Sequence, residues 1–246
     1  ANPTIPSNML QPQVAQYYDL KISGNVSGSV TFQPQGEIRV SNSFDLSRLN
    51  FLGAPNRRFN TNGSTVVFNG NNQDIPCRPQ SPADTVVNLS YYNLRVENSG
   101  TKQLRTSDAT TFIVLNDLTI TNGAALSLNS QNLEVQHSWL NAVAGSTFLP
   151  GTNSVIFRSI INDPLAPVTV TVRDTAQNPF HHVVVAGIGY TKPSDNWKVR
   201  GNFTIESGSK FIMGTATPTT LSLEGNWTNL GGTFTAGKST VRFDGT

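Results

Sequence analysis

Carboxylates are the first residues to test for chemistry in this chain, because glycoside hydrolysis uses a pair of them a few ångströms apart. The sequence has 15 acidic residues, which occur singly, without an Asp-x-Asp or Asp-Asp pair. Several, such as Glu134 and Glu206, stand at the polar step of an alternating segment, where a solvated side chain is expected. The H-E-x-x-H, G-x-S-x-G and phosphate-loop patterns are absent. We therefore predict no catalytic residues and a chain that is not an enzyme.

The three histidines, His137, His181 and His182, are the next candidates for a catalytic or metal site. Adjacent residues of a strand point to opposite faces, so we expect that His181 and His182 do not share one metal ion. The G-G-x-G-x-D repeat of calcium-binding β-rolls is absent. We predict no cofactor and no metal site, and keep single Ca²⁺ ions at Asp- or Asn-rich turns as the alternative.

The tryptophans Trp139, Trp197 and Trp227 could form a sugar-stacking surface. Trp139 and Trp227, however, stand at matching positions of an internal repeat, and aromatic residues at matching positions usually stack inside a core. We favour core packing for them and keep ligand stacking as the alternative.

The composition is typical of an extracellular β-rich protein. Charged residues make up 13% of the chain, against the usual ~25%, and Ser, Thr, Asn and Gly fill the polar positions. We therefore expect a secreted protein, extracellular or on the cell surface. The net charge of +2, with Arg57-Arg58 as the densest basic spot, indicates no nucleic-acid partner. The single Cys77 excludes an intrachain disulfide framework, and the sequence contains no apolar run long enough for a membrane helix.

An internal repeat organises the chain. The segment STVRFDG (239–245) matches STVVFNG (64–70) and, more weakly, NSVIFRS (153–159), and LTITNGAALSL (118–128) matches FTIESGSKFIM (203–213). The matched residues that we predict to form the structural core of the repeat are Phe68, Phe157 and Phe243, Leu118 and Phe203, and Trp139 and Trp227.

These matches divide the chain into three degenerate units with connecting segments. The predicted order is an extended or disordered leader (1–16), a short first unit (17–70), a linker (71–90), a second unit (91–159), a linker (160–179) and a third unit (180–246). We expect the second linker to contain a strand in VTVTVRD (168–174), and the third unit to continue beyond the chain end.

Each unit reads as short strands, because apolar and polar residues alternate and Gly or Asn separates the alternating segments. The expected inward residues of the second unit recur every six to nine positions: Leu118, Leu126, Leu133, Trp139, Phe148 and Ile156. This spacing favours an all-β parallel β-helix, or β-solenoid, in which each short strand turns a corner and begins the next face. Tandem immunoglobulin-like β-sandwiches are the alternative.

Four motifs carry a family resemblance: aromatic-aromatic-Asn-Leu-x-Val, Leu-Thr-Ile-x-x-Gly, Gly-Asn-Trp-x-Asn-x-Gly-Gly-x-Phe and Ser-Thr-Val-x-Phe-x-Gly. Together they resemble repeats of very large secreted surface proteins of Bacteroidetes, many exported by the type IX pathway and similar to filamentous-haemagglutinin and autotransporter β-helix adhesins. The resemblance covers 91–159 and 180–246 well and 17–70 in part. It implies adhesion, surface structure or gliding. A type IX cargo usually carries a C-terminal sorting domain, which does not follow Thr246, so we expect a piece of a longer protein or one whose signal was removed.

These observations lead to one expected function and one alternative. We expect a non-enzymatic structural or adhesive segment of a secreted bacterial cell-surface or filament-forming protein. Its expected partners are further repeats, or copies of itself end to end, and surface glycans, with no membrane insertion. End-to-end association is expected because the sequence indicates no cap helix over the solenoid edges. The alternative is a β-helix that binds or cleaves carbohydrate.

Overall fold

The chain is a parallel β-solenoid. The computed structural model describes residues 4–5, 14–26, 30–32, 35–46, 49–51, 59–61, 63–76, 90–105, 111–141, 145–163, 168–172 and 178–245. Cys77, most of the leader 1–16 and most of the linker 71–90 lie outside the described residues. The described residues form strands and turns and no helix, and their paired strands are parallel. The predicted β-helix is thus confirmed, and the sandwich alternative, which requires antiparallel sheets, is wrong.

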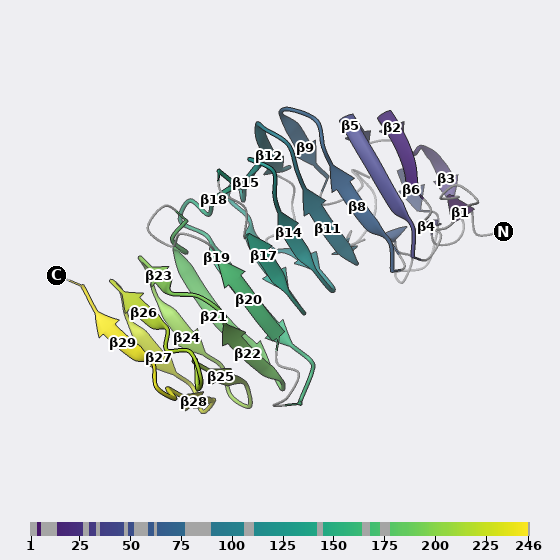
Figure 1. The fold of residues 1–246 in the computed structure, drawn as a ribbon. Coiled ribbons are helices and arrows are strands. Elements are labelled where there is room, and N and C mark those ends of the chain that lie inside the picture. Colours follow the sequence, from purple (N-terminus) through teal and green to yellow (C-terminus); the bar gives the residue numbers. More distant parts are fainter. Residues whose placement is uncertain are drawn as a thin grey trace.

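Two long sheets run the length of the stack, and the chain alternates between them (Figure 1). Sheet A contains β1 (Thr4–Ile5), β4 (Val30–Phe32), β7 (Phe59–Asn60), β10 (Ser90–Tyr91), β13 (Thr111–Val114), β16 (Asn132–Val135), β19 (Ser154–Ser159), β21 (His182–Gly187), β24 (Phe203–Ile205) and β27 (Trp227–Asn229). Sheet B contains β2 (Val14–Lys21), β5 (Glu37–Asp45), β8 (Thr65–Phe68), β11 (Asn93–Val96), β14 (Leu118–Ile120), β17 (Trp139–Asn141), β20 (Val168–Val172), β22 (Tyr190–Pro193), β25 (Lys210–Ile212) and β28 (Thr233–Thr235). β20 is the strand expected in the linker 160–179.

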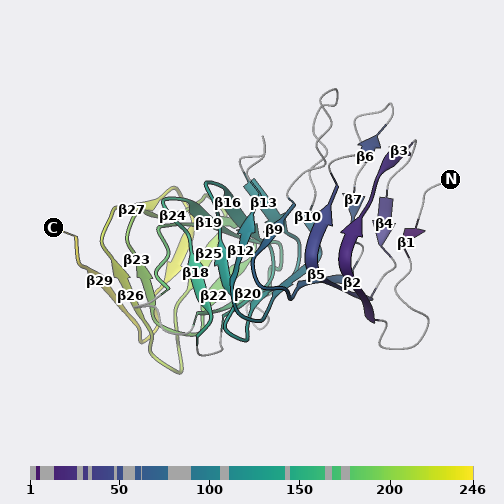
Figure 2. The same cartoon turned by 90° about the horizontal axis from the view of Figure 1, so that it is seen from above.

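A third face closes the solenoid and consists of three shorter sheets. Sheet C contains β3 (Gly24–Val26) and β6 (Leu49–Phe51); sheet D contains β9 (Gln73–Ile75), β12 (Thr101–Leu104), β15 (Ala125–Ser127) and β18 (Thr147–Leu149); sheet E contains β23 (Trp197–Val199), β26 (Thr220–Leu223) and β29 (Thr240–Phe243). We call one strand of sheet A, the next of sheet B and the segment that follows on the third face a coil. Seen from above, the first and last coils lie at opposite ends of the stack (Figure 2).

The length of a coil varies along the chain. Val183 pairs with Phe203, whereas Trp139 pairs with Val170, which lies considerably further along the sequence from its partner. At the tight turn between β14 and β15, Asn122 and Gly123 have φ angles of 53° and 78°, the left-handed region that this residue pair tolerates.

The core follows from the alternation seen in the sequence. Leu118 and Ile120 are buried and Thr119 between them faces outward, and most strands repeat this pattern. A continuous row of aromatic rings runs through the first half of the core, with neighbouring ring centroids 5.3–6.4 Å apart and both stacked and edge-on contacts: Phe32, Phe44, Phe68, Tyr91 and Phe112. The expectation that Ile156 points inward is wrong: it is half-buried, and its neighbours Val155 and Phe157 fill the core instead.

Asparagine side chains at the corners connect successive coils. The side-chain oxygen accepts a hydrogen bond from a backbone N–H of the following coil at Asn72 (to Thr101, 2.9 Å), Asn93 (to Asp117, 3.2 Å), Asn132 (to Ser154, 2.9 Å), Asn196 (to Thr220, 2.7 Å) and Asn202 (to Asn226, 3.1 Å). These contacts satisfy backbone donors just before or beside the strands. They give the high asparagine content of the chain a structural role.

Candidate functional site

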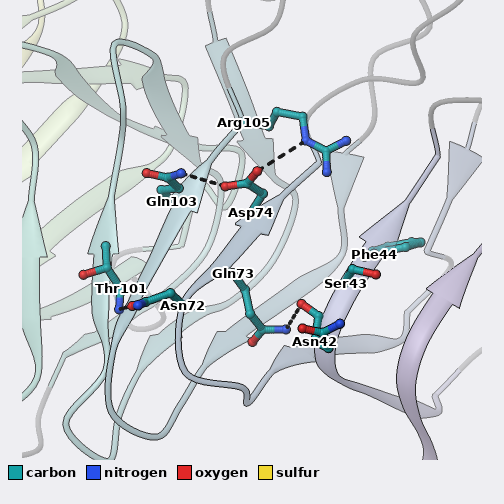
Figure 3. Close-up of a pocket in the computed structure, with 9 residues that line it drawn as sticks. All are labelled: Asn42, Ser43, Phe44, Asn72, Gln73, Asp74, Thr101, Gln103 and Arg105. Atoms are coloured by element: carbon teal, nitrogen blue, oxygen red, sulfur yellow. Dashed lines mark hydrogen bonds and ion pairs between the residues drawn. The ribbon is translucent and has the colours of Figure 1, made fainter.

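The third face is interrupted where sheet C gives way to sheet D, and a polar hollow of about 370 Å³ lies there, beside the first strand of sheet D. We call it the corner hollow. It is lined by Asn42, Ser43 and Phe44 of β5, Asn72, Gln73 and Asp74 in and before β9, and Thr101, Gln103 and Arg105 in and after β12 (Figure 3). Parallel stacking therefore brings three coils that are far apart in the sequence to one polar surface.

Asp74 is the centre of the polar contacts in the corner hollow (Figure 3). β9 and β12 are paired so that Asp74 lies opposite Gln103, whose amide nitrogen donates to the carboxylate at 2.7 Å. The Arg105 guanidinium lies 4.0 Å from the other carboxylate oxygen. All three side chains are partly or fully exposed, so the group can exchange these contacts for contacts with a ligand.

The floor of the corner hollow is built by Gln73. Its side chain is buried, donates to the backbone oxygens of Val40 and Asn42 at 2.9 and 3.2 Å, and accepts from the backbone N–H of Gly70 at 2.7 Å. Since all of these groups are backbone atoms, Gln73 holds β9 against β5 and fixes the width of the hollow.

One wall of the corner hollow is fixed from the first coil. The Asp19 carboxylate accepts from the Ser43 hydroxyl at 2.5 Å, from the Asn42 amide at 2.7 Å and from the Ser43 backbone N–H at 3.1 Å. The hydrogen bond from the Ser43 side chain, followed by that from Asn42, lowers the pKa of Asp19. Asp19 therefore stays ionised and orients both wall residues at neutral pH.

The corner hollow can bind hydrogen-bonding groups and is poorly suited to stack a ring. Among the described residues, the Asn72 amide nitrogen, the Gln103 amide oxygen and the Thr101 hydroxyl have no partner. Phe44 is fully buried, so its ring face is covered. Asp74 is the one carboxylate among the described lining residues, whereas glycoside hydrolysis generally uses two.

The residues predicted as the repeat core are spread over different faces of the solenoid. Phe68 lies in sheet B, Phe157 in sheet A and Phe243 in sheet E; Leu118 and Trp139 lie in sheet B, and their matches Phe203 and Trp227 lie in sheet A. Phe68, Phe157, Leu118, Phe203 and Trp139 are buried, Trp227 is partly buried and packs against the core, and Phe243 is 65% exposed. In the described structure, no residue of this set lies on the same face of the solenoid as its match in the sequence repeat. Trp227 lies beside Phe203 instead, with ring centroids 4.9 Å apart.

The two adjacent histidines lie closer together than the sequence suggested. The expectation of opposite faces is wrong, because His181 precedes β21, on a bend, and its ring contacts that of His182 with centroids 4.3 Å apart. Burial first, and the neighbouring His181 second, lower the pKa of His182. Its Nδ1 accepts from the backbone N–H of Asn202 at 2.8 Å, which connects two coils. The described residues contain no group of three metal-ligating side chains.

A closed ring of four charges lies on the outer face of sheet B, and sequence reasoning missed it. Arg39 contacts Glu37 and Glu97, each at 2.5 Å, and Arg95 contacts Glu37 at 2.6 Å and Glu97 at 3.1 Å. Val67 lies between the two arginines in the register and is fully buried although it belongs to the outward row. The signal in the sequence is Glu-x-Arg at 37–39 mirrored by Arg-x-Glu at 95–97, which has meaning only once the coil register is known.

Lys102 is a second polar residue that sequence reasoning missed. It points inward from β12 and is fully buried, and its ammonium donates to the backbone oxygens of Asn98 and Ser99, both at 2.9 Å. Burial lowers the pKa of Lys102 to about 8, partly opposed by the charge of Glu97. Its role is to satisfy two carbonyls of the turn that precedes β12.

No protein-family model, curated protein or solved structure matches the chain. Among the described residues, no helix has the length and hydrophobicity needed to cross a membrane.

Proposed function

We propose that the chain is a non-enzymatic structural and adhesive segment of a secreted cell-surface or filament-forming protein. The observation that carries this proposal is the uninterrupted pairing of sheets A and B, each from its first strand to its tenth. A load along the axis of such a stack is borne by backbone hydrogen bonds, by the stacked core rings and by the asparagine contacts at the corners. The resemblance to bacterial surface repeats and the low charge content support the same setting.

The last coil presents the apolar side chains and free strand edges that an end-to-end partner would need. Trp227, Phe234 and Val241 pack on the core and remain partly exposed, and Leu230 and Phe243 are 60% and 65% exposed. β27, β28 and β29 are each terminal strands of their sheets, so each offers an unpaired edge. We propose that a further coil of the same fold, from another repeat or another copy, stacks on this surface.

Adhesion and stacking can be tested separately. The chain displayed on a non-adhesive bacterial cell is expected to increase attachment to a glycan-coated surface under flow, and a chain with no effect on attachment would contradict the adhesive role. For stacking, sedimentation over a hundredfold concentration range should reveal association that weakens in Val241→Lys. Lys21→Glu, a change at an exposed residue of β2, serves as a charge-altered control. A monomer at all concentrations would contradict self-stacking.

Carbohydrate binding at the corner hollow is the second candidate function, favoured by its unpartnered amide and hydroxyl groups. A glycan screen with Asp74→Asn and Gln103→Ala is expected to show binding that both variants weaken about tenfold, since the first removes a charged acceptor and the second removes an amide that can bond to the ligand. The control is Asp244→Asn, a carboxylate on the last coil. Turnover of a polysaccharide that Asp74→Asn abolishes would replace the non-enzymatic proposal with the cleaving alternative.

A further inference from the structure

The third face is interrupted a second time, between β18 of sheet D and β23 of sheet E. The segment 178–180 lies in this gap. The Asn178 side-chain oxygen accepts from the backbone N–H of Phe148 at 2.6 Å, and Phe180 forms an isolated parallel bridge with Val199. The Asn178 side chain and the single bridge at Phe180 thus stand where a full strand would complete the third face. Beside them lies a hollow of about 330 Å³.

This second hollow, at the opposite edge of sheet D from the corner hollow, has an apolar lining. It is lined by Phe148, Leu149, Pro150, Gly151, Pro179, His181 and Arg200. Phe148 is buried, and its ring is held edge-on against Trp139 at 4.6 Å between centroids. Leu149 is 43% exposed although it is a large apolar residue, and two prolines stiffen the wall beside it. The volume lies at the lower end of the range of about 300–1,000 Å³ typical of small-molecule sites.

Arg200 gives the lining of this hollow a positive charge that no described carboxylate compensates. Arg200 is exposed, and among the described residues its guanidinium has no carboxylate or other side-chain partner. Glu224, which directly follows β26, is engaged by Lys198 at 2.7 Å. The described lining contains no carboxylate, and His181 adds a second nitrogen base. An apolar cavity with an unpaired guanidinium at its rim is complementary to a molecule with an apolar body and a carboxylate.

We propose that this hollow binds a small organic acid, with its apolar body against the exposed Leu149 and the partly exposed Pro150 and its carboxylate on Arg200. The planar guanidinium offers two parallel N–H donors to a carboxylate, which gives both orientation and selectivity for an acid over a neutral analogue. The proposal concerns a site separate from the stacking surface and the corner hollow, so it does not depend on either.

The experiment compares three ligands of one shape on the whole chain by isothermal titration calorimetry: 4-phenylbutyrate, its neutral amide and 4-phenylbutylamine. The acid is expected to bind at least about tenfold more tightly than the amide, because hydrogen bonds to a charged group are the stronger ones. No binding of the amine is expected. Arg200→Gln should reduce the affinity for the acid to that for the amide, and Leu149→Asp should abolish binding of both.

Arg242→Gln is the matched control: Arg242 is an exposed arginine in β29 of sheet E, and Arg200 is an exposed arginine that directly follows β23 of the same sheet. It should bind the acid as the unaltered chain does. Three results would overturn the proposal: no heat of binding with any ligand at millimolar concentration, equal affinities for acid and amide, or unchanged affinity in Arg200→Gln. Circular dichroism of each variant shows whether it is folded, and both substituted side chains are exposed enough that folding should be retained.

Discussion

Trp139 and Trp227 match in the sequence repeat but have different surroundings, and replacing each with alanine should therefore have different consequences. Trp139 is 1% exposed and contacts three aromatic rings, those of Phe148, Phe180 and Phe157, at centroid distances of 4.6, 5.5 and 5.9 Å. Coils stack on both sides of it. Trp227 is only partly buried and belongs to the last coil, where the structure has packing on one side.

The expected magnitudes follow from these surroundings. Trp139→Ala should lower the free energy of unfolding by about 4 kcal/mol, because it opens a cavity at a site enclosed by other aromatic rings. Trp227→Ala should cost about 2 kcal/mol, because part of its ring already contacts water. Since coils of a solenoid interact with their nearest neighbours, that cost should be confined to the last coil.

Urea unfolding and hydrogen exchange followed by mass spectrometry distinguish the two cases. Trp139→Ala is expected to shift the urea midpoint clearly. Trp227→Ala is expected to leave the main midpoint nearly unchanged and to accelerate exchange in peptides from 227–245. Equal midpoint shifts for both variants, or faster exchange in Trp227→Ala that reaches β19, would refute the assignment of Trp227 to a locally unfolding terminal coil.

Three further substitutions test the polar interior and the corners. The folded-state pKa of Lys102 is lowered from 10.5 to about 8, so between these two pH values the unfolded chain binds more protons than the folded chain, and the free energy of unfolding should rise with pH. Measured relative to Lys102→Met, this rise should be about 2 kcal/mol after allowance for solvent screening. The same pH dependence of stability in both chains would contradict the prediction. Glu97→Gln leaves two arginines partly uncompensated and should lower stability by about 2 kcal/mol, measured by thermal unfolding at low and high salt, with the smaller loss at high salt. Asn132→Ala removes the acceptor of the Ser154 N–H and should cost about 1 kcal/mol in urea unfolding. An Asn132→Ala variant as stable as the original chain would show that water replaces the contact.

The architecture was predictable because its signal is local. Alternation such as that of Leu118, Thr119 and Ile120 identifies a short strand with one buried face, and Asn122-Gly123 identifies the turn that ends it. The same local signal fails in a longer strand in which either set of alternate residues could face the core. In β19, Ile156 was expected inside, but Val155 and Phe157 on either side of it are both apolar and take the core positions.

The candidate sites could not be predicted, because they depend on register between coils. Glu37 lies in β5 and Glu97 directly follows β11, and β8 pairs with both of these strands, so the two acids are distant in sequence and close in space. Because the coils differ in length, no fixed period in the sequence would align them. Both hollows likewise lie where the third face changes from one sheet to another. The residues on either side of each change have no sequence pattern that predicts it.

The placement of matched phenylalanines in three different sheets has an evolutionary consequence. Phe68, Phe157 and Phe243 occupy the same position of one short sequence motif, yet the motif forms part of sheet B, then sheet A, then sheet E. A strand and its turn therefore act as an interchangeable unit that any face of the solenoid accepts, provided that it delivers one apolar row inward. Insertions and deletions need not comprise whole coils to be tolerated: a gain or loss of one strand rotates the downstream sequence by one face and preserves its buried row.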